Sequence, residues 1–262
     1  MGKIKIQING TEIDFSKQRG YFLNLDCMAA MKEMPDKSVD LAIVDPVYGD
    51  VTKGGYMQGQ GGEHAARRKD YHFGLWSQQK TGSDYFSELL RVSKNQIVWG
   101  GNYFCDNLPT SQGWVVWDKQ HPETIKYADC ELAWTSFNVA TRMFRFMWNG
   151  MLQGDMKNKE NRIHPTQKPV ILYKWLLNKY ANKGDVILDT HVGSASSLIA
   201  CEQLGYNYIG FEIDEVYYCK AKERLERETA QITIFDFMES NEIAGQMNRR
   251  SEERRVGKEC RS

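Results

Sequence analysis

The sequence predicts a doubly wound α/β sheet, on the strength of three observations. Short apolar runs rich in β-branched and aromatic residues alternate with segments of helical length. Several of these runs are almost continuously apolar, which is typical of strands covered on both faces. The stretches VILDTHVGSASSLI (186–199) and YIGFEIDEVYY (208–218) each have the order strand, loop, helix, which places ligands at the carboxyl ends of strands.

The predicted elements follow one another along the chain. Apolar runs that predict strands lie at Val39–Val44, Gln96–Trp99, Trp114–Trp117, Glu131–Trp134, Met143–Phe146, Val186–Leu188 and Tyr208–Phe211. Helices are expected at Ser83–Val92, Pro169–Ala181, Ser196–Leu204 and Asp214–Thr229. Pro169 suits the first turn of its helix, and Asp214 is a natural N-cap.

Two segments interrupt this alternation. Residues 51–80 contain six glycines and the basic cluster Arg67, Arg68 and Lys69, and we expect a mobile loop because structural connections are rarely so long. Residues 149–163 form a second polar loop. We therefore expect one domain at 21–235 with these loops inserted, an N-terminal extension at 1–20 and a tail at 236–249.

The last thirteen residues, RSEERRVGKECRS at 250–262, look foreign to the chain. They carry five basic and three acidic residues without apolar periodicity. They resemble the translation of a sequencing adapter, so we set them aside as a non-native tail; a native disordered tail is the alternative. The net charge is +0 with this tail and −2 without it, so any nucleic-acid binding depends on local basic patches.

Composition narrows the class of protein. No run approaches the roughly 18 apolar residues of a membrane-spanning helix. The N-terminal sequence MGKIKIQING lacks the apolar core of a signal peptide. The six cysteines are irregularly spaced and form no CxxC pair, which predicts reduced thiols in a cytoplasm and no metal site.

The glycine-containing turn ILDTHVGSASS (187–197) has the features of a ligand site. Gly193 lets the backbone approach a ligand, and the amides that open the following helix are donors. Asp189 ends the preceding strand and could accept from an ammonium, while Glu212 ends the next strand and could bind the two hydroxyls of a ribose. One glycine and two acids also fit an ordinary βαβ turn, so this pattern alone leaves both interpretations open.

Two further motifs make the pattern specific. DPVY, at Asp45–Tyr48, ends an apolar run with a carboxylate, a proline and an aromatic ring. HPTQKP, at His164–Pro169, fixes a short segment between two prolines; a helix entry with a solvated lysine is the alternative. Together with DTHVGSA (189–195), and in this order, the motifs resemble those of the β class of S-adenosylmethionine-dependent amino-methyltransferases of DNA. ELLRVSKNQIVWGGNYF (88–104) and GWVVWDK (113–119) are similar to stretches of its phage and prophage adenine members, and the resemblance covers Tyr21–Thr229.

This resemblance implies a Rossmann-like, doubly wound mixed sheet and methyl transfer to the exocyclic amine of a base flipped out of duplex DNA. Asp45 would accept a hydrogen bond from the amine, the carbonyl of Pro46 would be a second acceptor, and Tyr48 would stack on the base. An aspartate here favours the N6 amine of adenine, because the N4-cytosine members more often carry serine. No cysteine follows a proline, so a cytosine-C5 mechanism is not indicated.

The resemblance also implies S-adenosylmethionine as cofactor. Its site would be formed by Asp26, Cys27, Thr166, Lys168, Asp189, His191, Gly193, Ser194 and Glu212. Thr166 and Lys168 would lie near the methionine end, and Glu212 would bind the ribose. Asp26 equally fits a helix N-cap, and Cys27 a buried small residue.

Double-stranded DNA is the implied partner. Arg67, Arg68 and Lys69 would contact its phosphates, the alternative being a solvated basic loop, and residues 149–163 are a candidate recognition loop. The family's frequent dimerisation leaves a homodimer open, and neither a metal nor a membrane is implied.

Three substitutions depart from the family pattern. Val47 replaces the second proline of the catalytic motif and loosens the turn. His191 stands where phenylalanine is usual, and we expect a neutral, packed side chain. Ala195 stands where a glycine is usual, which is tolerable unless that position needs a positive φ. The alternatives to adenine methylation are N4-cytosine methylation and a cofactor- and DNA-binding protein with weakened catalysis.

Overall fold

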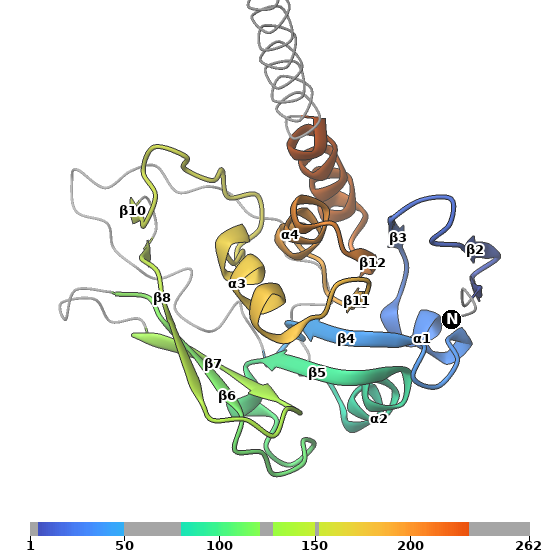
Figure 1. Cartoon of the computed structure of the whole chain (residues 1–262), viewed down its shortest axis with the longest axis horizontal. Coiled ribbons are helices and arrows are strands. Elements are labelled where there is room, and N and C mark those ends of the chain that lie inside the picture. Colours follow the sequence, from blue (N-terminus) through green and yellow to red (C-terminus); the bar gives the residue numbers. More distant parts are fainter. Residues whose placement is uncertain (1–4, 50–79, 121–127, 150–151, 231–262) are drawn as a thin grey trace, which may run out of the picture.

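An eight-stranded sheet runs through the computed structural model, which describes residues 5–49, 80–120, 128–149 and 152–230 (Figure 1). In spatial order its strands are β3 (Gly20–Asn24), β12 (Asn207–Glu212), β11 (Val186–Asp189), β4 (Val39–Val44), β5 (Ser93–Trp99), β7 (Cys130–Thr135), β6 (Trp114–Asp118) and β8 (Arg142–Arg145). The first five are parallel, β7 is antiparallel to β5 and to β6, and β8 is parallel to β6. The predicted mixed, doubly wound sheet is confirmed.

The strand order brings distant parts of the sequence together. β11 and β12 come from the C-terminal part of the chain, yet they lie between β3 and β4. Ile187 pairs with Tyr208 of β12 on one side and with Leu41 of β4 on the other. Because these strands are parallel, the loops that follow β12, β11 and β4 leave the same edge of the sheet.

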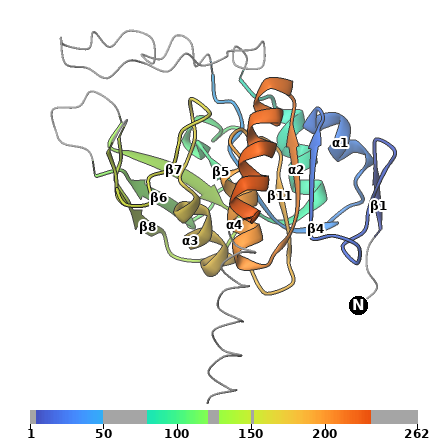
Figure 2. The same ribbon diagram turned by 90° about the horizontal axis from the view of Figure 1, so that it is seen from above.

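Helices cover both faces of the sheet (Figure 2). On β4, Leu41 and Ile43 pack in the core cluster that contains α3 (Val170–Tyr180) and α4 (Ser196–Leu204). Ala42 and Val44 pack in the cluster that contains α1 (Cys27–Glu33) and α2 (Ser83–Val92). All four β4 side chains are at most 1% exposed, so burial on both faces explains the continuous apolar run.

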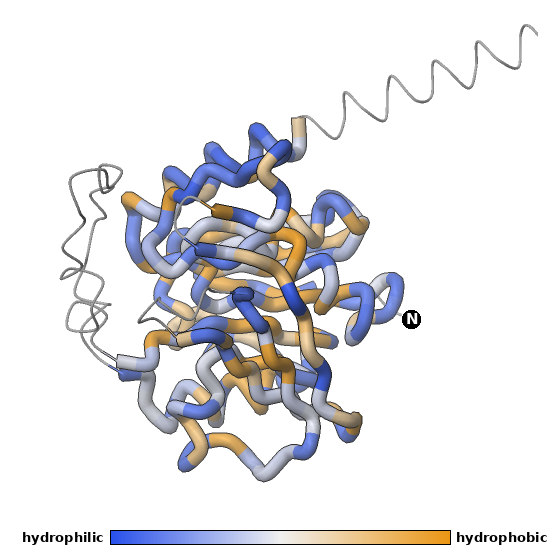
Figure 3. The backbone as a smooth tube through the Cα atoms, turned by 90° about the vertical axis from the view of Figure 1, so that its left-hand side faces the viewer, coloured by the Kyte–Doolittle hydropathy of each residue, from blue (hydrophilic) through white to orange (hydrophobic). Residues whose placement is uncertain are grey.

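A further helix, 215–230, follows β12 and leads away from the sheet. The carboxylate of Asp214 accepts hydrogen bonds from the backbone N–H groups of Val216 and Tyr217, at 2.9 and 3.2 Å, which confirms it as the N-cap. This helix is mainly hydrophilic, whereas hydrophobic residues concentrate in the central strands (Figure 3).

The predicted elements all occur, with small differences at their ends. The strand at Val39–Val44 and the helices at Ser83–Val92 and Ser196–Leu204 have the predicted bounds. Pro169 was expected in the first turn of α3 but stands one position earlier, as an extended N-cap residue with ψ 147°. Its lack of an N–H costs nothing at this position.

The sequence analysis missed the N-terminal elements. β1 (Ile6–Ile8) and β2 (Thr11–Ile13) form a hairpin with Asn9 and Gly10 at its turn. Both turn residues have positive φ, 47° and 75°, and Asn-Gly is the typical sequence of such a two-residue turn, so this signal was available. The hairpin buries its isoleucines in the cluster of α1 and α2. Short strands also form at β9 (Trp148–Asn149) and β10 (Leu152–Gln153), and a 3₁₀ turn, η2, at Gly101–Tyr103.

Candidate active site

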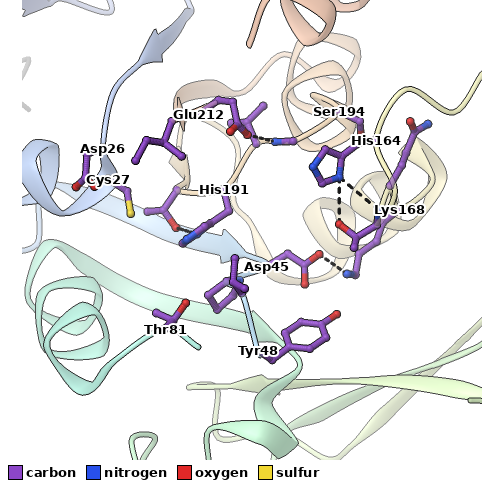
Figure 4. Close-up of a pocket in the computed structure, with 18 of the residues that line it drawn as sticks. Asp26, Cys27, Asp45, Tyr48, Thr81, His164, Lys168, His191, Ser194 and Glu212 are labelled. Carbon is purple, nitrogen blue, oxygen red and sulfur yellow. Dashed lines mark hydrogen bonds and ion pairs between the residues drawn. The ribbon is translucent and has the colours of Figure 1, made fainter. Parts of the chain in front are cut away.

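A pocket opens where β12, β11 and β4 end (Figure 4). Glu212 is the last residue of β12, and Asp45 comes directly after β4. The loop before α1 and the HPTQKP segment before α3 complete the walls. The edge of parallel strands thus gathers the three motifs that are separated in the sequence.

Eleven of the twelve predicted catalytic and cofactor residues line this pocket. They are Asp26, Cys27, Asp45, Pro46, Tyr48, Thr166, Lys168, His191, Gly193, Ser194 and Glu212. Asp189 is not in the pocket lining; it lies behind the glycine turn and is 2% exposed. The predicted DNA contacts Arg67, Arg68 and Lys69 lie outside the described residues.

Asp45 is held at one carboxylate oxygen only. Its Oδ2 accepts from the Lys168 ammonium at 2.5 Å, whereas its Oδ1 is buried and has no hydrogen-bond partner among the described residues. Burial raises the pKa of Asp45, and the Lys168 charge opposes that rise. One acceptor of the carboxylate is therefore fixed, and the other is available to a donor in the pocket.

Lys168 makes a second ion pair that the sequence did not indicate. Its Nζ lies 3.2 Å from Oε2 of Glu131 on β7, and the side chain is 2% exposed. Burial lowers the pKa of Lys168, but Asp45 and Glu131 outweigh this and hold it well above its usual value. We expected this ammonium near the cofactor, and the structure places it on the Asp45 carboxylate.

Tyr48 is stacked on a second tyrosine. Its ring and that of Tyr103 are 4.9 Å apart between centroids and within 3° of parallel. Tyr103 is 53% exposed and was missed by the sequence analysis, although it lies in the WGGNYF stretch after β5. A Cβ on Gly100 would lie 2.6 Å from the Tyr48 ring, so the glycine at this position, φ 66°, lets the ring lie where it does.

The glycine turn is shaped by two acidic side chains. Glu212 accepts from the backbone N–H groups of Gly193 at 2.7 Å and Asp214 at 2.9 Å. Asp189 accepts from the His191 N–H at 3.0 Å and from the Ser197 hydroxyl. Burial raises the pKa of Glu212, and raises that of Asp189 to about 7. Asp189 therefore fixes the glycine turn through two donors of that turn, and Glu212 joins the turn to the start of the next helix.

Ala195 lies in the left-handed region, with φ 63°, as the N-cap of α4. The condition under which its methyl group is unfavourable is therefore met, at a cost of about 1–2 kcal/mol. The flanking residues are held by Arg224, whose guanidinium donates to the Ser194 carbonyl at 2.8 Å and the Ser196 hydroxyl at 2.9 Å. These bonds support a turn that a glycine would form without strain.

Arg224 also joins this turn to the HPTQKP region. Its other nitrogen donates to Glu160 at 2.7 Å, and Glu160 in turn accepts from the backbone N–H of Val170, in the first turn of α3, at 2.8 Å. Arg224 is 3% exposed, and burial lowers its pKa. A buried arginine in the helix 215–230 was not recognisable from the sequence as part of the site.

HPTQKP is a rigid support for Lys168. The carbonyl of Gln167 accepts from the Trp148 indole at 2.9 Å, and its side-chain oxygen accepts from the Ile163 N–H at 2.9 Å. The His164 ring lies edge-on to Tyr217, with centroids 4.3 Å apart. Burial lowers the pKa of His164 to about 3, so this histidine is neutral at physiological pH.

His191 is the packed, neutral histidine that we expected. Its Nδ1 is 2.9 Å from the Thr190 hydroxyl, and its ring lies edge-on to Tyr85. Burial lowers its pKa to about 4. Asp26 caps α1 by accepting from the N–H groups of Met28 and Ala29, which confirms the N-cap interpretation while leaving the side chain in the pocket wall.

Neither a metal site nor a membrane-spanning helix is found among the residues that the structure describes. No group of three or more His, Cys, Asp or Glu side chains there is arranged to hold a metal ion. Among the helices formed by the same residues, none has the length and apolar character needed to cross a membrane.

Comparisons with known proteins extend these findings. Residues 118–223 match the N6/N4 methyltransferase family model, described as DNA methylase. The type II methyltransferase M.HpaI of Haemophilus parainfluenzae is 42% identical over 71 residues, which cover 27% of this chain and 23% of that protein. The type II methyltransferase M.HinfI of Haemophilus influenzae is 26% identical over 243 residues, covering 76% and 66%. The chain thus spans less than two thirds of either relative.

Two solved structures share the fold. A putative DNA modification methylase of Thermus thermophilus, complexed with S-adenosyl-L-methionine, is 15% identical with a TM-score of 0.50, over 80% of this chain and 96% of that one. The cytosine-N4-specific PvuII DNA methyltransferase is 12% identical with a TM-score of 0.51, over 82% and 93%.

The mixed sheet of this chain has the fold of these two methyltransferase structures. The resemblance to the N6/N4 amino-methyltransferases of DNA, predicted from the three motifs, is confirmed by the family match over residues 118–223 and by the relatives. The matched segment contains HPTQKP, the glycine turn and Glu131, whereas DPVY lies before it. The phage-like branch stays a prediction.

We expect Arg224→Met to destabilise the protein by about 3 kcal/mol, because it leaves Glu160 without its charge partner and the Ser194 carbonyl without a donor. Urea unfolding measures the change. Arg227→Met is the matched control, since Arg227 is on the same helix with a side chain 55% exposed. Equal midpoints for the two variants would contradict the role given to Arg224.

We expect His191→Phe to make stability less dependent on pH. The folded-state pKa of His191 is about 4, below the unfolded value of about 6.5. The contribution of His191 to stability is therefore complete above pH 6.5 and is lost as the pH falls towards 4. At pH 5 the loss from this group is about 2 kcal/mol. Urea unfolding at pH 7 and pH 5 should show a smaller difference in the variant; an unchanged difference would show that His191 is protonated in the native state.

Proposed function

We propose that this chain is an S-adenosylmethionine-dependent DNA methyltransferase that acts on the N6 amine of adenine. One observation carries the proposal. A buried, unpartnered carboxylate oxygen of Asp45 lies in a pocket shared with a stacked tyrosine and with a glycine turn at the carboxyl ends of parallel strands. The family match and the names of the relatives support the coarser statement, a DNA methyltransferase of the N6/N4 kind.

The residues of the pocket suit the cofactor. Glu212 already accepts one backbone hydrogen bond at each oxygen, and each oxygen keeps a second lone pair for a ribose hydroxyl. Gly193, φ 55°, keeps its backbone free of a side chain beside the pocket. Thr166 and Ser194 add hydroxyl groups to the wall. When bound, S-adenosylmethionine supplies a methyl group on a positively charged sulfur, which becomes a neutral thioether after transfer.

Asp45 would activate the amine. The exocyclic nitrogen of adenine is conjugated with the ring and is a poor nucleophile. A hydrogen bond from the amine to Oδ1, and a second to the carbonyl of Pro46, favour a pyramidal nitrogen whose lone pair forms the new N–C bond. The nitrogen then loses one proton, which Oδ1 accepts and passes to solvent. A pKa raised by burial makes Asp45 a better acceptor at this step.

Duplex DNA is the proposed partner, in the cytoplasm of a bacterial or phage-infected cell. The base must leave the helix to reach Asp45, and Tyr48 provides an aromatic surface for it. Arg67, Arg68 and Lys69 remain proposed phosphate contacts, and 149–163 a proposed recognition loop. A homodimer remains a prediction.

Adenine is favoured by Asp45, and N4 of cytosine is the second candidate. The fold does not separate the two bases, since the cytosine-N4-specific PvuII enzyme has it as well. A weakened enzyme is the third candidate, motivated by Val47 and Ala195. Val47 keeps its carbonyl engaged by the Thr81 N–H at 2.8 Å, a contact that a proline would also allow.

Nucleoside mass spectrometry tests the proposal. The full chain is expressed in a host that lacks adenine methylation, and its DNA is digested and quantified against empty vector and an Asp45→Ala variant. We expect N6-methyladenine with the wild type alone. N4-methylcytosine would overturn the choice of base. Neither product, from folded protein that binds S-adenosylmethionine, would favour weakened catalysis.

We expect Tyr103→Ala to raise the KM for DNA about tenfold, because a base–aromatic stack contributes about 1–3 kcal/mol and Tyr103 supports the Tyr48 ring. Tyr103→Phe keeps the stack and should resemble the wild type. Steady-state kinetics on plasmid DNA measures both, with Ile171→Ala, an exposed apolar residue on α3, as control. Matching KM values for Tyr103→Ala and the wild type would remove Tyr103 from the DNA-binding surface.

A further inference from the structure

Four charged side chains of alternating sign form a line that ends at Asp45. Lys119, just after β6, lies 2.5 Å from Oε1 of Glu131; Glu131 Oε2 lies 3.2 Å from Lys168; and Lys168 lies 2.5 Å from Asp45. The side chains are 15%, 25%, 2% and 13% exposed in that order. The line therefore runs from the antiparallel part of the sheet to the pocket.

We propose that Glu131 is a positioning residue for the methyl transfer: through Lys168 it holds the Asp45 carboxylate with Oδ1 directed to the target amine. This inference rests on the proposed function and deepens it. Nothing in the DPVY, HPTQKP or glycine motifs points to Glu131, which lies on β7.

The geometry explains why a second carboxylate is needed. An ammonium has three donors and is free to rotate, so a single partner does not fix it. Glu131 Oε2 attracts the Lys168 ammonium from the side of β7 as an ion pair without a hydrogen bond, and the ring of Trp99 lies 5.4 Å away. Held between these groups, Lys168 meets only Oδ2 of Asp45. The remaining oxygen is thereby reserved for the substrate.

Glu131 also affects how strongly the Asp45 carboxylate accepts a proton. Lys168, Glu131 and Tyr48 act directly on the Asp45 carboxylate, Tyr173 faces Lys168, and Asp189 is a further charge behind the pocket. Burial raises the pKa of Asp45, Lys168 opposes this, and the negative charge of Glu131 restores part of the rise. Without that charge Lys168 would act on Asp45 alone. The carboxylate would then be a weaker acceptor for a proton.

The test uses Glu131→Gln, which keeps the shape of the side chain and removes its charge. We expect kcat on plasmid DNA to fall at least about tenfold, with the KM values for DNA and S-adenosylmethionine little changed. The acid limb of the pH profile of kcat should move to lower pH, because the pKa of Asp45 falls. Asp118→Asn is the matched control: Asp118 pairs with Arg145 at the exposed edge of the same sheet region, with side chains 35% and 62% exposed.

Two results would overturn the proposal. One is a Glu131→Gln enzyme with the kcat and pH profile of the wild type. The other is a loss of kcat with an unmoved profile and a lowered unfolding midpoint, which would show a structural role only. If the wild type methylates no base, the proposed function fails. The ion pair between Glu131 and Lys168 is then tested separately, by urea unfolding of Glu131→Gln, Lys168→Met and the double variant. If the losses of unfolding free energy in the two single variants add up to the loss in the double variant, Glu131 and Lys168 are not coupled.

Discussion

The candidate site depends on the ion pairs that the buried ammonium of Lys168 forms with Asp45 and Glu131. A charge that is 2% exposed is stable only if it is paired and hydrogen-bonded, and its two partners come from opposite parts of the sheet. Asp45 follows β4 in the parallel half, and Glu131 lies on β7 in the antiparallel half. The Lys168 ammonium is therefore paired only when both halves of the sheet are folded together. The rigid HPTQKP segment positions Lys168 between the two carboxylates.

The three acidic side chains at the strand ends have different tasks, and their hydrogen bonds separate them. Asp189 uses both oxygens on donors of the glycine turn, and Glu212 uses one on the Gly193 N–H and the other on the Asp214 N–H, so their first role is to shape the loops at this edge. Asp45 alone of the three keeps a buried oxygen without a partner among the described residues. An unsatisfied buried acceptor costs about 1–3 kcal/mol, which is a sign of a site that awaits a donor. Because only Asp45 of these three has such an oxygen, we assign to it the hydrogen bond with the substrate amine.

The sequence predicted the fold and the pocket wall far better than the contacts behind it. Continuous apolar runs mark β4 and β12 because both faces are buried, and motifs of fixed spacing mark the residues at strand ends. Glu131, Arg224 and Tyr103 carry no such signal. Each acts through a partner at least 28 residues away, and only the strand order and helix packing bring the pairs together. The Asn9–Gly10 hairpin is a different case, since its turn signal was local and was overlooked.

The departures from the family pattern bear on whether the catalytic turn is intact. A proline at position 47 would stiffen the turn through its ring; Val47 lacks that restriction, and its carbonyl accepts from the Thr81 N–H, as a proline carbonyl would. Ala195 is strained, but Arg224 holds the carbonyl before it and the hydroxyl after it. At Ala195, hydrogen bonds from a distant residue therefore support a conformation that the local sequence disfavours, whereas the bond at Val47 does not distinguish valine from proline. Asp45 and Gly193 line the pocket despite these two departures, in agreement with the active enzyme that we propose.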